Sequence, residues 1–248
     1  MEKAEYQKHF ELEESFWWFR GRRDVLLNVF RSRAALHAPL VWLDAGCGTG
    51  FNMTVFAAFG PVAGCDFSAE ALAYCQQRGL RTIARADVQS LPYREGIFDA
   101  VSLLDVLYHK NIRDDVAALK DAARTLKPGG WLLVSDSAFN ALSGSHDRAF
   151  HARERYRKKT LGPRIEAAGF EIVRMGYFNH FLFPLILLVR FWERVRGARR
   201  PDAASDLKAV SPAANAVLYG VLRLEAFLSK KIDLPWGSSI VCLARKNK

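Results

Sequence analysis

A glycine-rich turn directly after an apolar segment constrains the fold of this chain more than any other feature. The segment "LDAGCGTG" (43–50) follows "PLVW" (39–42) and has glycine at three alternate positions. Because glycine has no Cβ, such a turn bends sharply and allows a ligand to approach the main chain closely. The pattern predicts a strand whose carboxyl end opens onto a binding site.

The residues around the turn limit which ligand it can bind. A phosphate-binding loop needs Lys and Ser/Thr after its last glycine, but Phe51 and Asn52 follow Gly50 here. A dinucleotide turn has the spacing G-x-G-x-x-G, whereas this turn reads G-x-G-x-G. Asp44, two residues before the first glycine, would repel a pyrophosphate. These features favour a ligand with a cationic end.

Two further acids follow strand-like segments. Asp66 ends "PVAGCD", 20 residues after Gly46, a spacing at which an acid on the second strand accepts both hydroxyls of a ribose. Asp87 follows "RTIARA" and is positioned to bind an adenine amino group. Three carboxylates around one crevice suit an adenosine that carries a positive charge. S-adenosylmethionine (SAM), with a sulfonium and an ammonium group, meets this description.

At this point the sequence resembles the class I, Rossmann-like SAM-dependent methyltransferases with a methyltransferase-11 or methyltransferase-12 type domain. The segments "VWLDAGCGTG", "GCDFS", "ADVQSLPYREGIFDAV" and "LKPGGWLLVS" follow the family's order and spacing from about 40 to 136. The resemblance implies an α/β fold with a doubly wound, mostly parallel seven-stranded sheet, helices on both faces and a helical cap. It also implies SAM as cofactor and S-adenosylhomocysteine as product, with no metal.

The resemblance also implies which residues contact the cofactor. They comprise the turn near the methionine end, the end of the second strand at the ribose, the loop at the adenine and the end of the fourth strand. Arg23 is either a partner of the methionine carboxylate or a solvated arginine. The predicted cofactor-binding residues are Asp44, Gly46, Gly48, Asp66, Phe67, Asp87, Val88 and Leu104.

The pattern of strands and helices predicts four regions. Residues 1–38 form an N-terminal helical cap, 39–178 a SAM-binding Rossmann-like domain, 179–236 a helical insertion, and 237–248 the last strand with a basic tail. Strands are expected at 170–178 and 238–246, as an antiparallel hairpin that the insertion interrupts.

The insertion begins "NHFLFPLILLVRFWERVRGARR", in which the apolar run is shorter than the ~20 residues of a membrane-spanning helix. Arg190 interrupts it, and an arginine cluster follows. Three alternatives stay open: a lid over the sheet or a greasy pocket, a helix in an anionic membrane interface, or an oligomer interface.

Methyl transfer requires an oriented acceptor and, for a hydroxyl, a base. His146 and His151 in "SGSHDRAFHARERY" are the catalytic candidates, with Asp147 as an orienting acid and Tyr156 downstream. His109 in "LLDVLYHK" is a further histidine near the crevice. For each histidine the alternative is an ordinary surface or structural position.

Charge and composition set expectations for substrate and compartment. Residues 41–130 contain nine Lys/Arg and ten Asp/Glu, and the rest of the chain contains 27 and 16, so the excess of the +10 net charge lies outside the cofactor region. The Asn/Asp-Pro-Pro-Tyr/Phe signature of many amino-group methyltransferases is absent. We therefore expect a small hydrophobic or anionic, lipid-like acceptor, most readily a hydroxyl, over a nucleic acid.

Two alternatives are an RNA methyltransferase and a non-catalytic SAM-binding partner subunit. The four cysteines, without a Cys-x-x-Cys pair, and the polar N-terminus indicate the cytoplasm, with contact at the inner face of the membrane as an extension. The oligomeric state is left open.

Overall fold

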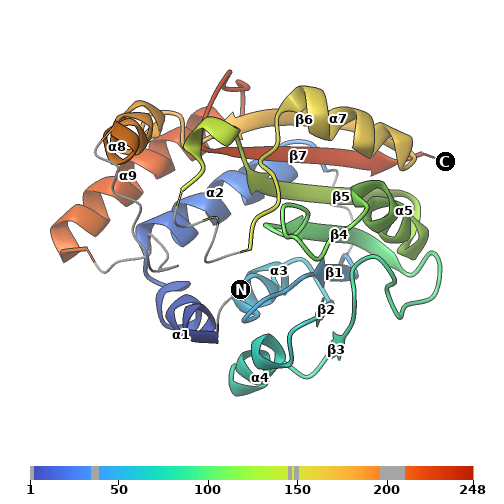
Figure 1. Ribbon diagram of the computed structural model, residues 1–248. Helices are drawn as coiled ribbons and strands as arrows, with labels where there is room; N and C mark the ends of the chain where they lie inside the picture. The colour runs from blue at the N-terminus through green and yellow to red at the C-terminus, as the bar shows by residue number, and fades with distance from the viewer. Residues whose placement is uncertain (1–2, 35–38, 145–146, 148–150, 196–209, 248) are drawn as a thin grey trace.

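The computed structural model describes residues 3–34, 39–144, 147, 151–195 and 210–247. One seven-stranded sheet runs through it (Figure 1). In chain order the elements are α1 (Lys3–Leu12), α2 (Trp17–Arg31), β1 (Trp42–Ala45), α3 (Phe51–Phe56), β2 (Val62–Asp66), α4 (Ala69–Gln77), β3 (Ile83–Arg85), β4 (Phe98–Leu104), α5 (Asp115–Thr125), β5 (Leu126–Ser137), η1 (Asn140–Leu142), α7 (Lys158–Ala167), β6 (Phe170–Phe178), α8 (Phe183–Val195), α9 (Pro212–Leu228) and β7 (Ser239–Lys246).

The strand order is β3-β2-β1-β4-β5-β7-β6, with parallel pairing from β3 to β5. β7 is inserted antiparallel between β5 and β6. The order reverses at β1 and β4, and a ligand crevice forms at the carboxyl ends of the strands on either side of such a switch point. The predicted doubly wound, mostly parallel sheet is confirmed, as is the antiparallel pairing of the last two strands.

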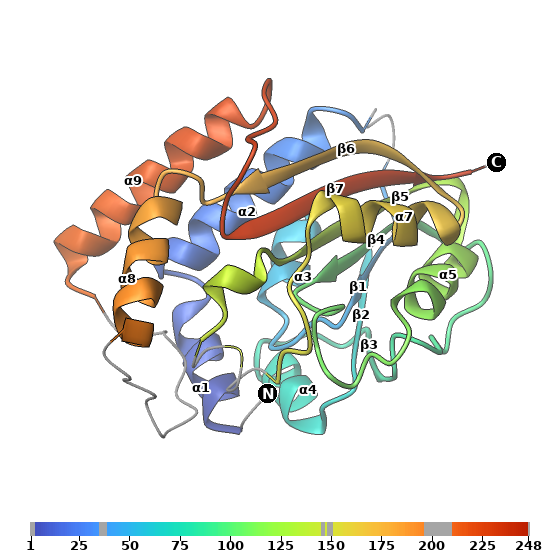
Figure 2. The same ribbon diagram turned by 45° about the horizontal axis from the view of Figure 1, so that its top comes forward.

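Helices cover both faces of the sheet (Figure 2). On one face α5 and α7 bury Leu119 and Leu161 against strand residues. On the other, α2 and α9 pack on each other and bury Phe30 and Ala226 against β1, β5 and β7. Trp42 of β1 stacks on Phe56 at a centroid distance of 4.2 Å. These two apolar layers hold the sheet rigid beneath the site.

Local sequence signals account for several helix starts. Ser68, Asp114 and Ser211 are N-caps whose side chains accept from the backbone N–H three residues later. Helix α5 ends at Thr125, and the Pro128-Gly129-Gly130 turn that follows belongs to β5.

The segment 179–236 contributes α8 and α9, which lie with α1 and α2 at one end of the molecule (Figure 1). No helix in the described part of the chain is long and apolar enough to cross a membrane. The division of the chain into a cap, a cofactor domain and an insertion stays a prediction.

Candidate active site

A cavity of about 1690 Å³ opens at the carboxyl ends of β1, β2 and β4. The N-terminal helices, the loops after β3, β4 and β5, and α8 enclose it. The structure brings most of the sequence-predicted cofactor residues to its wall: Gly46, Gly48, Asp66, Phe67, Asp87, Val88 and Leu104. Asp44 is not on the wall but is buried in β1, 1 % exposed.

The glycine turn has the backbone that its sequence requires. Gly46, Gly48 and Gly50 all have positive φ, a region that favours glycine. A Cβ at Gly46 would lie 2.4 Å from Cγ2 of Val106, so no larger residue fits there. A Cβ at Gly48 would meet no atom within 4 Å, and this glycine lines the cavity. The main chain at Gly48 is therefore open to a ligand.

Asp66 links the end of β2 to this turn. Its Oδ2 accepts from the Gly48 N–H at 2.9 Å, and its Oδ1 accepts from the Ser68 N–H at 2.9 Å. Burial raises the pKa of this carboxyl, while the two backbone N–H groups oppose the shift. A carboxylate oxygen has two acceptor positions, so each oxygen retains one for a ligand hydroxyl.

Asp44 carries a buried and incompletely satisfied carboxyl. Its Oδ1 accepts from the Ser102 hydroxyl at 2.6 Å, and its Oδ2 has no hydrogen-bond partner among the described residues. Burial raises the pKa of Asp44 to about 7. A cation bound nearby would favour the charged form of the Asp44 carboxyl, because its opposite charge stabilises the buried carboxylate.

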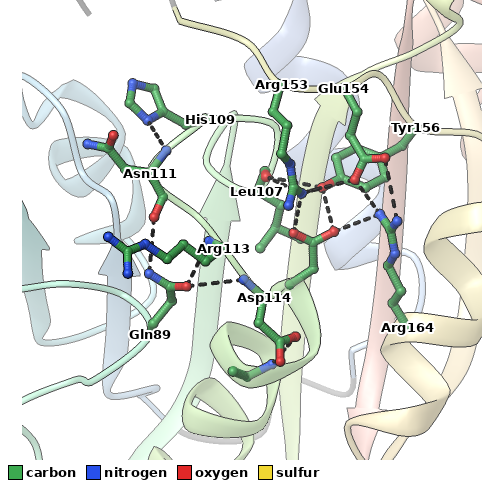
Figure 3. A network of polar contacts seen from close by, with 12 residues as sticks. Gln89, Leu107, His109, Asn111, Arg113, Asp114, Arg153, Glu154, Tyr156 and Arg164 are labelled. Atoms are coloured by element: carbon green, nitrogen blue, oxygen red, sulfur yellow. Dashed lines mark hydrogen bonds and ion pairs between the residues drawn. The ribbon is translucent and has the colours of Figure 1, made fainter.

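Asp87, the third acid predicted at the cavity, is held by hydrogen bonds to Gln89. Asp87 accepts from the backbone and side-chain N–H groups of Gln89. The Gln89 side-chain oxygen accepts from the N–H groups of Arg113 and Asp114, as Figure 3 shows. The loops after β3 and β4 are thus tied together beside Val88.

The N-terminal helices are fastened to the glycine turn by a residue that sequence reasoning missed. Glu13, after α1, accepts from the Thr49 hydroxyl and pairs with Arg78, the residue that follows α4, at 3.1 Å. Arg78 also donates to the Thr49 carbonyl at 2.9 Å. Burial raises the pKa of Glu13. This cluster fixes the cap on the wall of the cavity.

We expect Glu13→Gln to lower the free energy of unfolding by about 1.5 kcal/mol, because it removes the charge that Arg78 faces in a mostly buried pair. Chemical denaturation monitored by circular dichroism measures this. Glu11→Gln is the matched control, since Glu11 is exposed and bonds only Gln7 in the described contacts. Equal stability of the two variants would contradict a fastening role for Glu13.

Arg23, the candidate partner of the methionine carboxylate, makes its described contacts with the cap and with Phe51. Its guanidinium donates to the backbone carbonyls of Glu13 and Glu14 and stacks over Phe51 at 4.4 Å. Burial lowers its pKa to about 10. Arg23 lines the cavity but its described contacts brace the cap.

An ion pair that the sequence analysis did not predict lies at the end of β4. Asp105, with φ of +56°, pairs with the buried Arg22 at 3.0 Å, and both line the cavity. Burial, and then the charge of Asp105, raise the pKa of Asp136 well above its usual range. The positive φ of a non-glycine residue is costly and is often retained at functional sites. Only the spatial pairing with Arg22 makes Asp105 stand out.

Of the two predicted catalytic histidines, His151 lines the cavity, and His146 lies outside the described residues. His151 has φ of +53°, and its ring centre lies 5.9 Å from that of His109, which lines the same cavity. Burial lowers the pKa of His109 to about 4, so His109 is neutral at pH 7. The backbone at Asn111 donates to its Nδ1 at 3.2 Å, which places the ring proton on Nε2.

Tyr156 does not reach the cavity wall and belongs to a buried network (Figure 3). Its hydroxyl donates to Asp115 at 2.8 Å, and Asp115 also pairs with Arg153 and Arg164. Its role is therefore to anchor the segment that carries His151, not to move protons. Asp147, the expected orienting acid, forms a two-bond pair with Arg155.

The sheet order and the position of the cavity at the carboxyl ends of the parallel strands are those of a Rossmann-like domain. Residues 43–134 match the family described as "Methyltransferase domain". The fold is shared with an S-adenosylmethionine-dependent methyltransferase from Mesorhizobium loti, with a TM-score of 0.59, 17 % identity, and coverage of 90 % of this chain and 98 % of that one. Residues 43–134 are thus similar to this family of methyltransferase domains, and the chain shares the fold of the Mesorhizobium loti protein.

Two curated relatives extend the comparison. A tRNA (carboxymethyluridine(34)-5-O)-methyltransferase of Arabidopsis thaliana is 35 % identical over 106 residues, 41 % of this chain and 25 % of the relative. A Mycolicibacterium smegmatis protein named "Probable S-adenosylmethionine-dependent methyltransferase" is 30 % identical over 174 residues, 68 % of this chain and 65 % of the relative. The chain therefore spans a quarter to about two thirds of the length of these relatives.

Proposed function

We propose that this protein transfers the methyl group of SAM to a small hydrophobic or anionic acceptor, at a hydroxyl. The observation that carries the proposal is a single cavity with two chemically distinct halves. One half is the acid-rich glycine turn, and the other is lined by aromatic residues of the cap and by Leu182, Leu185, Ile186 and Val189 of α8 and its approach.

The residues of the first half fit SAM. The open main chain at Gly48 and the Asp66 carboxylate on the cavity wall match a ligand that carries hydroxyls. The Asp44 carboxyl, buried in β1, favours a cationic group nearby. When bound, SAM supplies an electrophilic methyl group. The chain itself positions the acceptor and excludes water.

His151 is the base in this proposal. It lies on the cavity wall, and the network around Tyr156 anchors its segment. It accepts the proton of the acceptor hydroxyl as the new oxygen–carbon bond forms. His109, neutral and with its proton on Nε2, is the adjacent hydrogen-bond donor.

We expect SAM to bind more tightly as the pH rises toward about 7 and to show a level affinity above it. The pKa of Asp44 is raised to about 7, so below this value the carboxyl is protonated in the free protein. A cationic ligand favours the charged form, binding releases the proton, and affinity changes by at most tenfold per pH unit. Titration calorimetry from pH 5.5 to 8.5 measures this.

Asp44→Asn should show weaker binding with a flat profile over the same range. A wild-type profile that is equally flat would exclude Asp44 as the titrating group.

The acceptor class is tested with radiolabelled SAM and fractionated cell extract. Counts in lipid or small organic-soluble molecules support the proposal. Counts in RNA would favour the alternative suggested by the name of the Arabidopsis relative and by the basic residues outside 41–130. SAM binding without transfer to any fraction would indicate a partner subunit.

For the compartment we propose the cytoplasm, supported by four buried cysteines that form no disulfide.

A further inference from the structure

Helix α8 exposes much of its apolar surface. Large side chains on it are between about two fifths and three fifths exposed: Leu185, Leu187, Leu188, Val189, Phe191, Trp192 and Val195. α9 adds Val217, Leu224 and Phe227, each more than half exposed. Both helices lie at the same end of the molecule in the two views (Figures 1 and 2). Exposed apolar side chains gathered on neighbouring helices mark an interaction site.

The side of α8 that faces the cavity carries a buried arginine. Arg190 is 8 % exposed, lines the cavity and lies against Gly144, where a Cβ would be 2.8 Å from its Nη1. Arg190, which interrupts the apolar run of this helix in the sequence, therefore faces the cavity. Leu185 and Val189 line the cavity and are also about half exposed. The rim of the cavity thus belongs to the apolar surface of α8.

The charge beside this surface is positive. Arg223, Lys230 and Lys231 are exposed on α9 and just after it, and the Lys230 ammonium lies 5.6 Å from the Phe227 ring centre. The one acid in 210–231, Glu225, is buried and accepts from the His180 backbone. A second copy of the chain would bring like charges together across a two-fold axis, which disfavours self-association.

We propose that α8 and α9 dock on an anionic lipid surface, and that the acceptor is an amphiphile that enters the cavity from this surface past Leu185 and Val189. The helices lie in the interface, with apolar side chains inserted and cationic groups at the headgroups. The acceptor part rests on the proposed methyltransferase function; the docking part does not. An apolar rim lets a hydrocarbon chain pass from the lipid to the cavity without the unfavourable exposure of its apolar surface to water.

The test uses sedimentation of the full chain with vesicles of phosphatidylglycerol or phosphatidylcholine. We expect binding to phosphatidylglycerol at low salt, weaker binding to phosphatidylcholine, and partial release at 0.5 M salt because screening shortens the range of the charges. Wild-type protein that stays in the supernatant with phosphatidylglycerol at low salt would overturn the proposal.

Two variants separate the contributions. Leu188→Asp/Phe191→Asp changes exposed residues that do not line the cavity and should reduce vesicle affinity at least about tenfold. Arg223→Gln/Lys230→Gln/Lys231→Gln should reduce the affinity for phosphatidylglycerol by about fivefold per residue and leave that for phosphatidylcholine unchanged. Ile97→Asp, at an exposed apolar residue before β4, is the matched control and should bind as wild type.

SAM affinity, measured by calorimetry on each variant, reports whether the fold is intact. Unchanged vesicle binding in the Leu188→Asp/Phe191→Asp variant would overturn docking through α8. A concentration-dependent dimer in analytical ultracentrifugation that this variant abolishes would assign the surface to a second copy instead. If vesicle binding holds but label enters neither lipid nor small organic-soluble molecules, the methyl-transfer proposal fails and the docking proposal stands.

Discussion

His151→Asn should reduce the rate of methyl transfer by about 10²- to 10⁴-fold, the range for loss of a general base, while SAM affinity stays as in the wild type. Asn is chosen because His151 has φ of +53°, a conformation that Asn tolerates better than most residues. The rate is measured as transfer of radiolabel to the acceptor fraction at saturating SAM.

His180→Asn is the matched control. His180 bonds the Trp236 carbonyl through Nδ1 and does not line the cavity, so its replacement should leave the rate unchanged. A His151→Asn enzyme with wild-type turnover would return this histidine to a structural role.

Asp66→Ala should weaken SAM binding by roughly 1–3 kcal/mol, because it removes a charged acceptor and leaves ligand hydroxyls unpaired. The same change releases the Gly48 N–H, so part of the loss reflects a less ordered glycine turn. Titration calorimetry measures the affinity directly.

Two variants calibrate this loss. Asp66→Asn keeps the size and one acceptor oxygen and should lose less affinity than Asp66→Ala. Glu95→Ala removes an exposed acid outside the cavity and should bind as wild type. Full SAM affinity in Asp66→Ala would exclude this carboxylate from the cofactor site.

Much of the cofactor half could be predicted from the sequence, because its signals are local. Three alternate glycines, and acids at the ends of apolar segments, specify a turn and two strand ends without knowledge of distant contacts. The parallel sheet then brings Gly48, Asp66 and Asp87 to one edge, as the cavity wall shows.

The acceptor half could not be predicted in the same way. Tyr156 lies near the candidate histidines in the sequence, but its hydroxyl donates a hydrogen bond to Asp115, 41 residues away, in the core. Arg190 interrupts an apolar run in the sequence, and the position of α8 directs it toward the cavity. A helical pattern shows which residues share a face, and only packing shows what that face meets.

By itself, the sequence determined the order of strands and helices, the glycine turn and the acids that follow β2 and β3, since these depend on backbone preferences within a few residues. The tertiary structure alone decided the pairing of Glu13 with Arg78, of Arg22 with Asp105, and of the cap with the turn. These contacts join residues 36 to 83 positions apart. Their partners are selected by how the sheet and helices pack, because side chains that are distant in sequence meet only when the layers between them are filled.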